Sequence, residues 1–343
     1  MRKLASRFKR LVRGFGQLPV WLRRAFGGLI ARFRRVPAGD HGHLYQARSH
    51  PGSRDRRYVV HEPPKRDPGR ALPLVMVLHG CRQDNRDIET ITGFNELADR
   101  RGFLVVYPFV TSYRGLRNRN CWGWWFDREI HSGAGEVEDL WQIIEEVKRQ
   151  YPVDANRIHV TGLSSGAGMA VAMMVAHSEH IASGAAVAGV PYAERATAAR
   201  HALNDNPRNR PVVSIVKAMQ DEMGASARLV PIQIVHSQQD QTVDLKSAEV
   251  LRDSWGHCFG INTRLPAKVT TGSDGDVDWE HSRYVNDAGE SVIETLFLEG
   301  PGHGWYGGNP GDFSYPDAPD IKQGIWQFFK ANPMRAADRR QVA

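Results

Sequence analysis

Short apolar runs alternate with amphipathic segments through residues 58–331 of the 343-residue chain. We predict strands at 72–80, 103–108, 157–162, 183–189, 231–237 and 294–300 and helices at 88–101, 136–151, 165–177, 243–256 and 320–331. Apolar strands that alternate with helices are typical of a mostly parallel sheet covered by helices on both faces. The expected fold class is therefore α/β, with one domain over residues 58–331 that is large enough to be a catalytic domain. Residues 264–290 form either a hairpin excursion or a loop.

The positive charge of the chain is concentrated at its amino terminus. Residues 1–36 hold eleven Lys or Arg and no Asp or Glu, and removing those eleven charges from the formal net charge of +7 leaves about −4 for the rest. The folded body is therefore not expected to bind nucleic acid. Apolar residues recur there at steps of three and four, which predicts basic amphipathic helices interrupted near Pro19.

The flanking segments and the cysteines bear on the cellular compartment of the protein. Residues 37–57 are polar and rich in Gly and His, so they are interpreted as a linker, and residues 332–343 as a flexible tail. Paired arginines split the N-terminal apolar residues, so neither a transmembrane helix nor a secretory signal is predicted. Three cysteines, Cys81, Cys121 and Cys258, favour a reducing compartment. We expect a cytoplasmic protein, with secretion as the alternative.

The stretch GLSSGAG at 162–168 follows a predicted strand and precedes a predicted helix. A G-x-S-x-G nucleophile elbow needs glycines two residues before and two after its serine, because the turn leaves no room for side chains there. Gly162 and Gly166 bracket Ser164 in this way, whereas Ser165 has Leu163 and Ala167 at those positions. Ser164 is therefore the candidate nucleophile.

A serine hydroxyl needs a general base and an acid that orients the base. In the order Ser, Asp, His along the chain, Asp240 follows the strand at 231–237 and His303 follows the strand at 294–300. The alternative for Asp240 is a helix cap, and for His303 a loop histidine without a role. His236 lies within a strand and is interpreted as a core histidine or as a residue that supports the site.

Two further groups of residues are candidates at the same site. The backbone N–H groups of Ser165 and Cys81 are predicted to bind the oxyanion, while the Cys81 thiol is either a buried small group or half of a bridge to Cys121. Trp122, Trp124 and Trp125 in NCWGWWFD are either core residues or an apolar substrate-binding wall. Trp305 is assigned to substrate binding with them.

The motifs LHGCRQ, GFLVVYP, CWGWW, VTGLSSGAGMA, the Asp240 loop and PGHGW together resemble the catalytic domain of the poly(3-hydroxybutyrate) depolymerase family, whose relatives include feruloyl and acetylxylan esterases. The resemblance implies an α/β-hydrolase fold and hydrolysis of carboxylic esters without a cofactor or metal. It also implies Ser164, Asp240 and His303 as the triad and Cys81 and Ser165 as oxyanion donors.

Three functions are consistent with these residues. The leading expectation is a serine esterase that cleaves polyesters or oligoesters of short-chain 3-hydroxyalkanoates. The second is a feruloyl or acetylxylan esterase with the same triad. The third belongs to another class: a protein that coats a polyester granule or an anionic membrane through residues 1–36, since a basic amphipathic helix binds such surfaces.

Overall fold

The computed structural model describes residues 39–64, 69–110, 120–198 and 209–335. In these residues ten strands form one sheet in the order β1-β2-β4-β3-β5-β6-β7-β10-β9-β8, and β11 pairs with β12 in a small second sheet. The strands are β1 (Gly39–Tyr45), β2 (Arg56–Glu62), β3 (Leu72–Leu78), β4 (Leu104–Pro108), β5 (Val153–Leu163), β6 (Ser183–Val187), β7 (Ile232–Ser237), β8 (Lys268–Asp274), β9 (Val277–Val285), β10 (Ser291–Leu298), β11 (Trp305–Tyr306) and β12 (Ser314–Tyr315).

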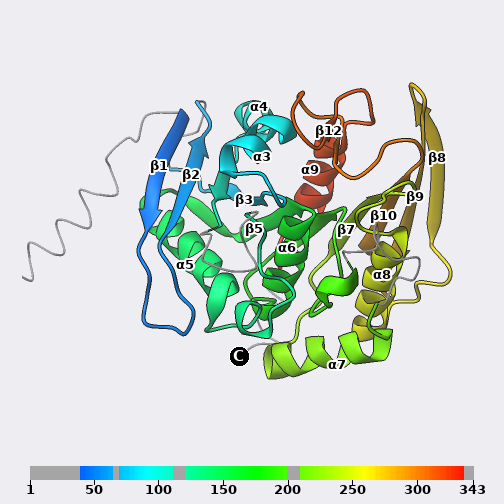
Figure 1. Cartoon of the computed structure of the whole chain (residues 1–343), viewed down its shortest axis with the longest axis horizontal. Coiled ribbons are helices and arrows are strands. Elements are labelled where there is room, and N and C mark those ends of the chain that lie inside the picture. Colours follow the sequence, from blue (N-terminus) through cyan, green and yellow to red (C-terminus); the bar gives the residue numbers. More distant parts are fainter. Residues whose placement is uncertain (1–38, 65–68, 111–119, 199–208, 336–343) are drawn as a thin grey trace, which may run out of the picture.

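The centre of the large sheet is parallel and its two edges are antiparallel. Strands β4, β3, β5, β6, β7 and β10 run in one direction, while β1 and β2 extend one edge and β9 and β8 the other (Figure 1). The predicted mostly parallel α/β sheet is confirmed. Parallel strands place their carboxyl ends at a common edge, so residues that follow β5, β7 and β10 lie at the same side of the molecule.

Helices cover both faces of the sheet. The helices are α3 (Asn85–Thr92), α4 (Phe94–Arg101), α5 (Gly135–Gln150), α6 (Ser165–Ala176), α7 (Val212–Met223), α8 (Leu245–Phe259) and α9 (Ile321–Ala331), with short 3₁₀ turns at Asp127–Glu129 and Gly224–Ser226. Strand β3 shows the division: Leu74 and Met76 belong to the core under α5, α6, α7 and α8, and Val75 and Val77 to the core under α3, α4 and α9. A strand buried on both faces is apolar at every position, as its sequence is.

Several elements differ from the sequence prediction. The single helix expected at 88–101 is two helices, because Gly93 takes the left-handed conformation with φ 60° between them. Helix α7 was not predicted. The expected hairpin or loop at 264–290 contains the antiparallel pair β8 and β9, so the hairpin interpretation is confirmed.

The predicted linker at 37–57 is wrong over its described residues, since Gly39–Tyr45 is a strand paired with β2. Its exposed and half-buried positions alternate with period two, but the sequence GDHGHLY is too polar to be recognised as a strand. The tail at 332–343 is also shorter than predicted, because Met334 is buried and its amide donates to the Asn156 carbonyl at 2.8 Å. The amphipathic prediction for residues 1–36 lies outside the described residues.

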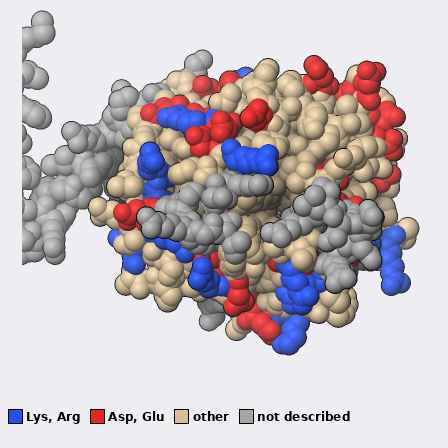
Figure 2. Space-filling model, viewed as in Figure 1, with Lys and Arg blue, Asp and Glu red and all other residues tan. Residues whose placement is uncertain are grey.

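The outer hairpin of the sheet is acidic. Asp274, Asp276, Asp278 and Glu280 are exposed, and Figure 2 shows red side chains gathered over β8 and β9 at the right of the view. Charge on an edge strand opposes pairing with the strands of other molecules. None of the helices in the described ranges has the length and apolar character needed to cross a bilayer.

A buried ionic network fastens the start of β2 and the residues just before it to helix α5. Arg56 and Asp139 are both shielded from solvent, and the Arg56 Nε donates to Asp139 Oδ2 at 2.8 Å. Asp139 also accepts from the Ser53 hydroxyl at 2.6 Å and from the Arg54 amide at 3.1 Å. These bonds join residues more than 80 positions apart in the chain. Because the partners are desolvated, removal of Asp139 would leave only Glu136 among the described residues, 3.8 Å from Arg56, to offset the buried positive charge.

We expect Asp139→Ala to lower the free energy of unfolding by about 3–5 kcal/mol, since the buried Arg56 guanidinium would lose its hydrogen-bonded carboxylate and keep the more distant Glu136, at 3.8 Å. Urea denaturation followed by circular dichroism measures this change. The matched control is Asp221→Ala, which removes a carboxylate from an exposed pair with Lys217 and should cost less than about 1 kcal/mol. Equal effects of the two substitutions would contradict the role of the buried network.

Candidate active site

Ser164 lies at the sharp turn between β5 and α6. Its backbone has φ 57° and ψ −117°, a conformation that residues with a side chain seldom adopt. Two backbone hydrogen bonds hold the turn: the Ser164 amide donates to the Val187 carbonyl at 2.9 Å, and the Gly168 amide donates to the Ser164 carbonyl at 3.0 Å. The structure therefore has the strained strand-to-helix turn that the sequence motif predicts.

The two framing glycines are required by contacts with β3. A Cβ atom on Gly162 would lie 2.7 Å from the Leu78 carbonyl oxygen and 2.6 Å from the backbone of Gly166. A Cβ on Gly166 would overlap the Leu78 carbonyl oxygen and lie 2.6 Å from that of His79. These contacts are with backbone, which cannot rotate away as a flexible side chain can. The glycines thus permit close packing of the turn on the neighbouring strand.

Asp240 and His303 are brought together from loops that follow β7 and β10. The His303 Nδ1 donates to Asp240 Oδ2 at 2.6 Å. The other carboxylate oxygen accepts from the amides of Thr242 and Val243 at 2.8 and 2.9 Å. Since a carboxylate can only accept, the proton of His303 is on Nδ1, and Nε2 is available as an acceptor.

Ser164 lies at the same edge of the sheet, because β5, β6, β7 and β10 are parallel neighbours. In the described structure no hydrogen bond joins the Ser164 hydroxyl to the His303 ring. Such bonds are often long in an empty active site and shorten when substrate binds. The structure thus joins the predicted base to its predicted acid and places the predicted nucleophile at the same edge of the sheet, which are the three groups that acyl transfer uses.

The loops that carry Asp240 and His303 are fastened to each other. The Ser237 hydroxyl donates to the Pro301 carbonyl, and the Gly300 amide donates to the Gln239 side-chain oxygen at 2.8 Å. Sequence reasoning gave Ser237 and Gln239 no role. Their position within three residues of the predicted acid was the only signal available for them. Together these bonds keep the two loops in a fixed relation.

The charge on Asp240 is maintained by its neighbours. Burial alone would raise the pKa of this carboxyl, but the hydrogen bond from His303 and the electrostatic interactions with His303 and then His236 lower it below its usual value. His236 is fully buried and its Nε2 donates to the Val243 carbonyl at 2.7 Å, while burial lowers the pKa of the ring. His236 lies 3.6 Å from Asp240 and so supports the acid loop.

A second loop approaches the nucleophile from the end of β3. The Gly80 amide donates to the Gln83 side-chain oxygen at 2.9 Å, and a Cβ on Gly80 would lie 3.6 Å from the Ser164 Cβ. The His79 Nδ1 donates to the Gly80 carbonyl at 2.8 Å, and its Nε2 accepts from the Val110 amide at 3.2 Å. Burial lowers the pKa of His79 to about 4, so the ring stays neutral and can both donate and accept.

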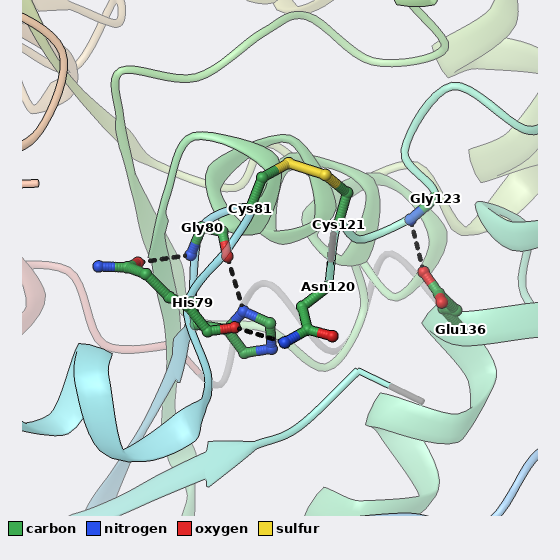
Figure 3. Close-up of a disulfide and its surroundings, with 8 residues drawn as sticks. His79, Gly80, Cys81, Asn120, Cys121, Gly123 and Glu136 are labelled. Carbon is green, nitrogen blue, oxygen red and sulfur yellow. Dashed lines mark hydrogen bonds between the residues drawn. A yellow bond between two sulfur atoms is a disulfide. The ribbon is translucent and has the colours of Figure 1, made fainter. Parts of the chain in front are cut away.

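Cys81 is bonded to Cys121 by a disulfide, as Figure 3 shows, which decides between the two alternatives for its thiol. The bridge ties the loop after β3 to the tryptophan segment. That segment is also held by Glu136, whose carboxylate accepts from the Gly123 amide at 2.6 Å (Figure 3). Within the described ranges, neither the Cys81 amide nor the Ser165 amide donates to a backbone carbonyl. The predicted oxyanion role requires two such N–H groups without an internal acceptor.

The four tryptophans divide into two groups. Trp122 and Trp305 have no exposed surface and lie in the main cores, so the prediction that they bind substrate is wrong. Trp124 is 5% exposed and forms a small apolar cluster with Val190 and Val243, against which the half-buried Trp125 packs. This cluster adjoins the nucleophile helix, because a Cβ on its Gly168 would lie 2.9 Å from the Trp124 ring. Trp124 and Trp125 remain candidates for a substrate wall.

The family model described as "Esterase PHB depolymerase" matches residues 57–268, more than half of the chain. The chain belongs to this family of esterases. Poly(3-hydroxyalkanoate) depolymerase C of Paucimonas lemoignei is 29% identical over 234 residues, which cover 68% of this chain and 55% of that protein. The chain thus matches about half the length of this depolymerase. Probable acetylxylan esterase A of Aspergillus flavus is 26% identical over 242 residues, 67% of this chain and 74% of the relative.

Solved structures place the fold among the α/β-hydrolases. An acetyl xylan esterase from Aspergillus awamori superimposes with a TM-score of 0.66 at 17% identity, covering 85% of this chain and 99% of that one. A ferulic acid esterase gives a TM-score of 0.52 at 14% identity, with coverage of 86% and 99%. The α/β-hydrolase fold and the predicted PHB depolymerase esterase family are confirmed, and hydrolysis of carboxylic esters is the activity that this family membership supports.

For this esterase we expect Gly166→Ala to reduce kcat for a soluble ester by about 100-fold, because the new methyl group must push the elbow off β3 and a shift of about 1 Å at a nucleophile has this effect. Release of p-nitrophenol from p-nitrophenyl butyrate measures this decrease in kcat.

Gly324→Ala is the matched control. Gly324 lies in α9, and a Cβ there meets no atom within 4 Å, so the substitution should leave kcat unchanged and stabilise the helix by about 0.5–1 kcal/mol. Wild-type kcat in Gly166→Ala would contradict the packing requirement at the elbow.

Proposed function

We propose that this chain is a serine esterase that hydrolyses polyesters or oligoesters of short-chain 3-hydroxyalkanoates through an acyl-enzyme on Ser164. The observation that carries the catalytic assignment is the 2.6 Å hydrogen bond from His303 to Asp240, at the edge of the sheet that also holds the strained Ser164 turn. It fixes the tautomer in which Nε2 is the basic nitrogen. The roles of Ser164, Asp240, His303, Cys81 and Ser165 below are part of this proposal.

In the acylation step His303 Nε2 takes the proton from Ser164 as Oγ forms a bond to the ester carbonyl carbon. The carbonyl oxygen becomes an oxyanion, which the amides of Cys81 and Ser165 stabilise. The intermediate collapses when its bond to the alkoxide breaks, and the imidazolium gives its proton to that alkoxide. Asp240 keeps the ring oriented and stabilises its positive charge.

Deacylation repeats these steps with water as the nucleophile. His303 removes a proton from the water, the oxygen attacks the acyl carbon, and the same two amides bind the second oxyanion. The bond to Ser164 then breaks, its oxygen regains the proton from His303, and the carboxylic acid leaves. No redox step or additional reactant is needed.

The apolar cluster of Trp124, Val190 and Val243, with Trp125 packed against it, supports a small apolar acyl group as substrate. Val243 is three residues from Asp240 and Trp124 packs on α6, so the cluster lies beside the catalytic residues. The 29% identity to a poly(3-hydroxyalkanoate) depolymerase supports the same substrate class.

An acetylxylan or feruloyl esterase is the second candidate. It is favoured by the similarity to acetylxylan esterases, because the match to one of them spans 74% of that relative's length. The candidate uses the same catalytic residues and differs in the alcohol and acyl groups that it accepts.

We also propose that residues 1–36 bind a polyester granule or an anionic lipid surface and that the protein is cytoplasmic. The eleven cations of this segment, interleaved with apolar residues, support the first proposal. The Cys81–Cys121 disulfide is an argument for the alternative location, secretion, since disulfides persist in oxidising compartments.

The two adjacent serines should respond differently to substitution. We expect Ser164→Ala to lower kcat for p-nitrophenyl butyrate by about 10⁴-fold or more, because the acyl-enzyme can no longer form. Ser165→Ala should change kcat by less than about tenfold, since its backbone N–H remains and its buried hydroxyl has no hydrogen-bond partner to lose. Retained activity in Ser164→Ala, with its circular dichroism unchanged, would reject the nucleophile assignment.

The apolar cluster should determine which esters the enzyme prefers. We expect higher kcat/KM on amorphous poly(3-hydroxybutyrate) than on acetylated xylan or methyl ferulate, measured side by side by release of free acid. Trp125→Ala should reduce kcat/KM for a butyryl ester more than for an acetyl ester, because the apolar contact of the longer chain is lost.

Trp279→Ala is the control for this test, since Trp279 is also half-buried but lies on β9. A preference of the wild-type enzyme for acetylated xylan would favour the second candidate instead.

A further inference from the structure

A strongly basic hollow lies at the opposite end of the sheet from the esterase site. It has a volume of about 630 Å³, and its charged lining residues are Arg70, Arg100, Arg101, Arg157, Lys330 and Asp99. Leu72 at the start of β3 and Gly102 at the end of α4 also line it. Because the esterase residues follow the carboxyl ends of the strands, whereas Leu72 begins β3, the hollow is separate from that site.

The composition of the hollow contrasts with the rest of the molecule. Five cations and one carboxylate line it, although the chain after residue 36 carries a net charge of about −4. The cations converge from four segments that are far apart in the sequence: the turn before β3, helix α4, strand β5 and helix α9. A generally basic surface cannot account for this cluster.

Most of this positive charge is not neutralised by the described residues. Arg157 is paired with Asp154 at 2.7 Å, and Asp99 interacts with His61 at 2.8 Å. No ion pair joins Arg100, Arg101 or Lys330 to a residue in the described ranges. Like charges held in one hollow repel each other, and the low-dielectric walls of a concave surface concentrate their field. The hollow is therefore electrostatically suited to an anion of high charge density.

The end of helix α4 explains only part of the cluster. Cations in the last turn of a helix favourably oppose its dipole, which accounts for Arg100 and Arg101. It does not account for Arg157 or Lys330, which come from other elements. Arginine presents a planar fork of donors that fits phosphate oxygens in pairs, and four of the five cations are arginines.

We propose that this hollow binds a soluble ligand that carries two or more adjacent phosphate groups, such as an oligophosphate or the phosphate chain of a nucleotide. The site is independent of the proposed ester substrate. It uses no residue of the candidate active site.

The test is isothermal titration of the full chain with sodium tripolyphosphate, together with thermal unfolding in the same solutions. We expect saturable 1:1 binding to the folded body and a rise in Tm, since a ligand bound only to the native state stabilises it. The double variant Arg100→Ser/Arg101→Ser should bind at least about tenfold more weakly and lose the rise in Tm. Lys330→Ser, on a different helix, should weaken binding in the same direction.

Two controls separate this site from general charge effects. Arg34→Ser/Arg35→Ser removes two cations from the N-terminal segment, and Arg149→Ser removes an exposed one from the end of α5. Both should retain the wild-type affinity and the rise in Tm. Equal losses of affinity in the control variants and in the Arg100/Arg101 and Lys330 variants would overturn the proposal. The absence of a rise in Tm with the wild type would also overturn it. Binding to phosphatidylglycerol vesicles through Arg100 and Arg101 without binding to tripolyphosphate would also overturn it.

Discussion

The close approach of the Ser164 turn to the end of β3 is the constraint on which the site depends. Gly162 and Gly166 let the backbone of the turn pack directly on the Leu78 carbonyl, where any side chain would overlap it. This contact brings the elbow next to the loop that contains Gly80 and Cys81. The strained conformation of Ser164 persists because strand, helix and neighbouring loop all hold it in place.

Polar bonds made away from the reacting atoms stabilise the loops around this turn. Neutral His79 joins Gly80 to Val110, and the bonds of Ser237 and Gln239 join the acid and base loops. The candidate oxyanion loop is additionally tied to the tryptophan segment by the disulfide. A loop-borne site thus becomes rigid through hydrogen bonds between loops, as preorganised catalysis requires.

The sequence was most informative where a local rule applies. The glycine frame distinguished Ser164 from Ser165, because the elbow is a short-range steric requirement. The parallel core was recognisable because its strands are rich in apolar residues, and β3 is apolar at every position. By contrast, the polar composition of Gly39–Tyr45 predicts a linker where the structure has a strand, since an exposed edge strand needs few apolar residues. Trp122 and Trp305 were assigned to substrate, although packing buries both.

The sequence by itself therefore determined the α/β class, the candidate nucleophile and the order of its partners, because these follow from periodicity and from steric limits within a few residues. Only the tertiary structure decided which tryptophans are buried, that Cys81 pairs with Cys121, and that five cations from four distant segments line one hollow. These features depend on contacts between residues far apart in the chain. Their geometry is set by the packing of the whole domain, which no local pattern in the sequence encodes.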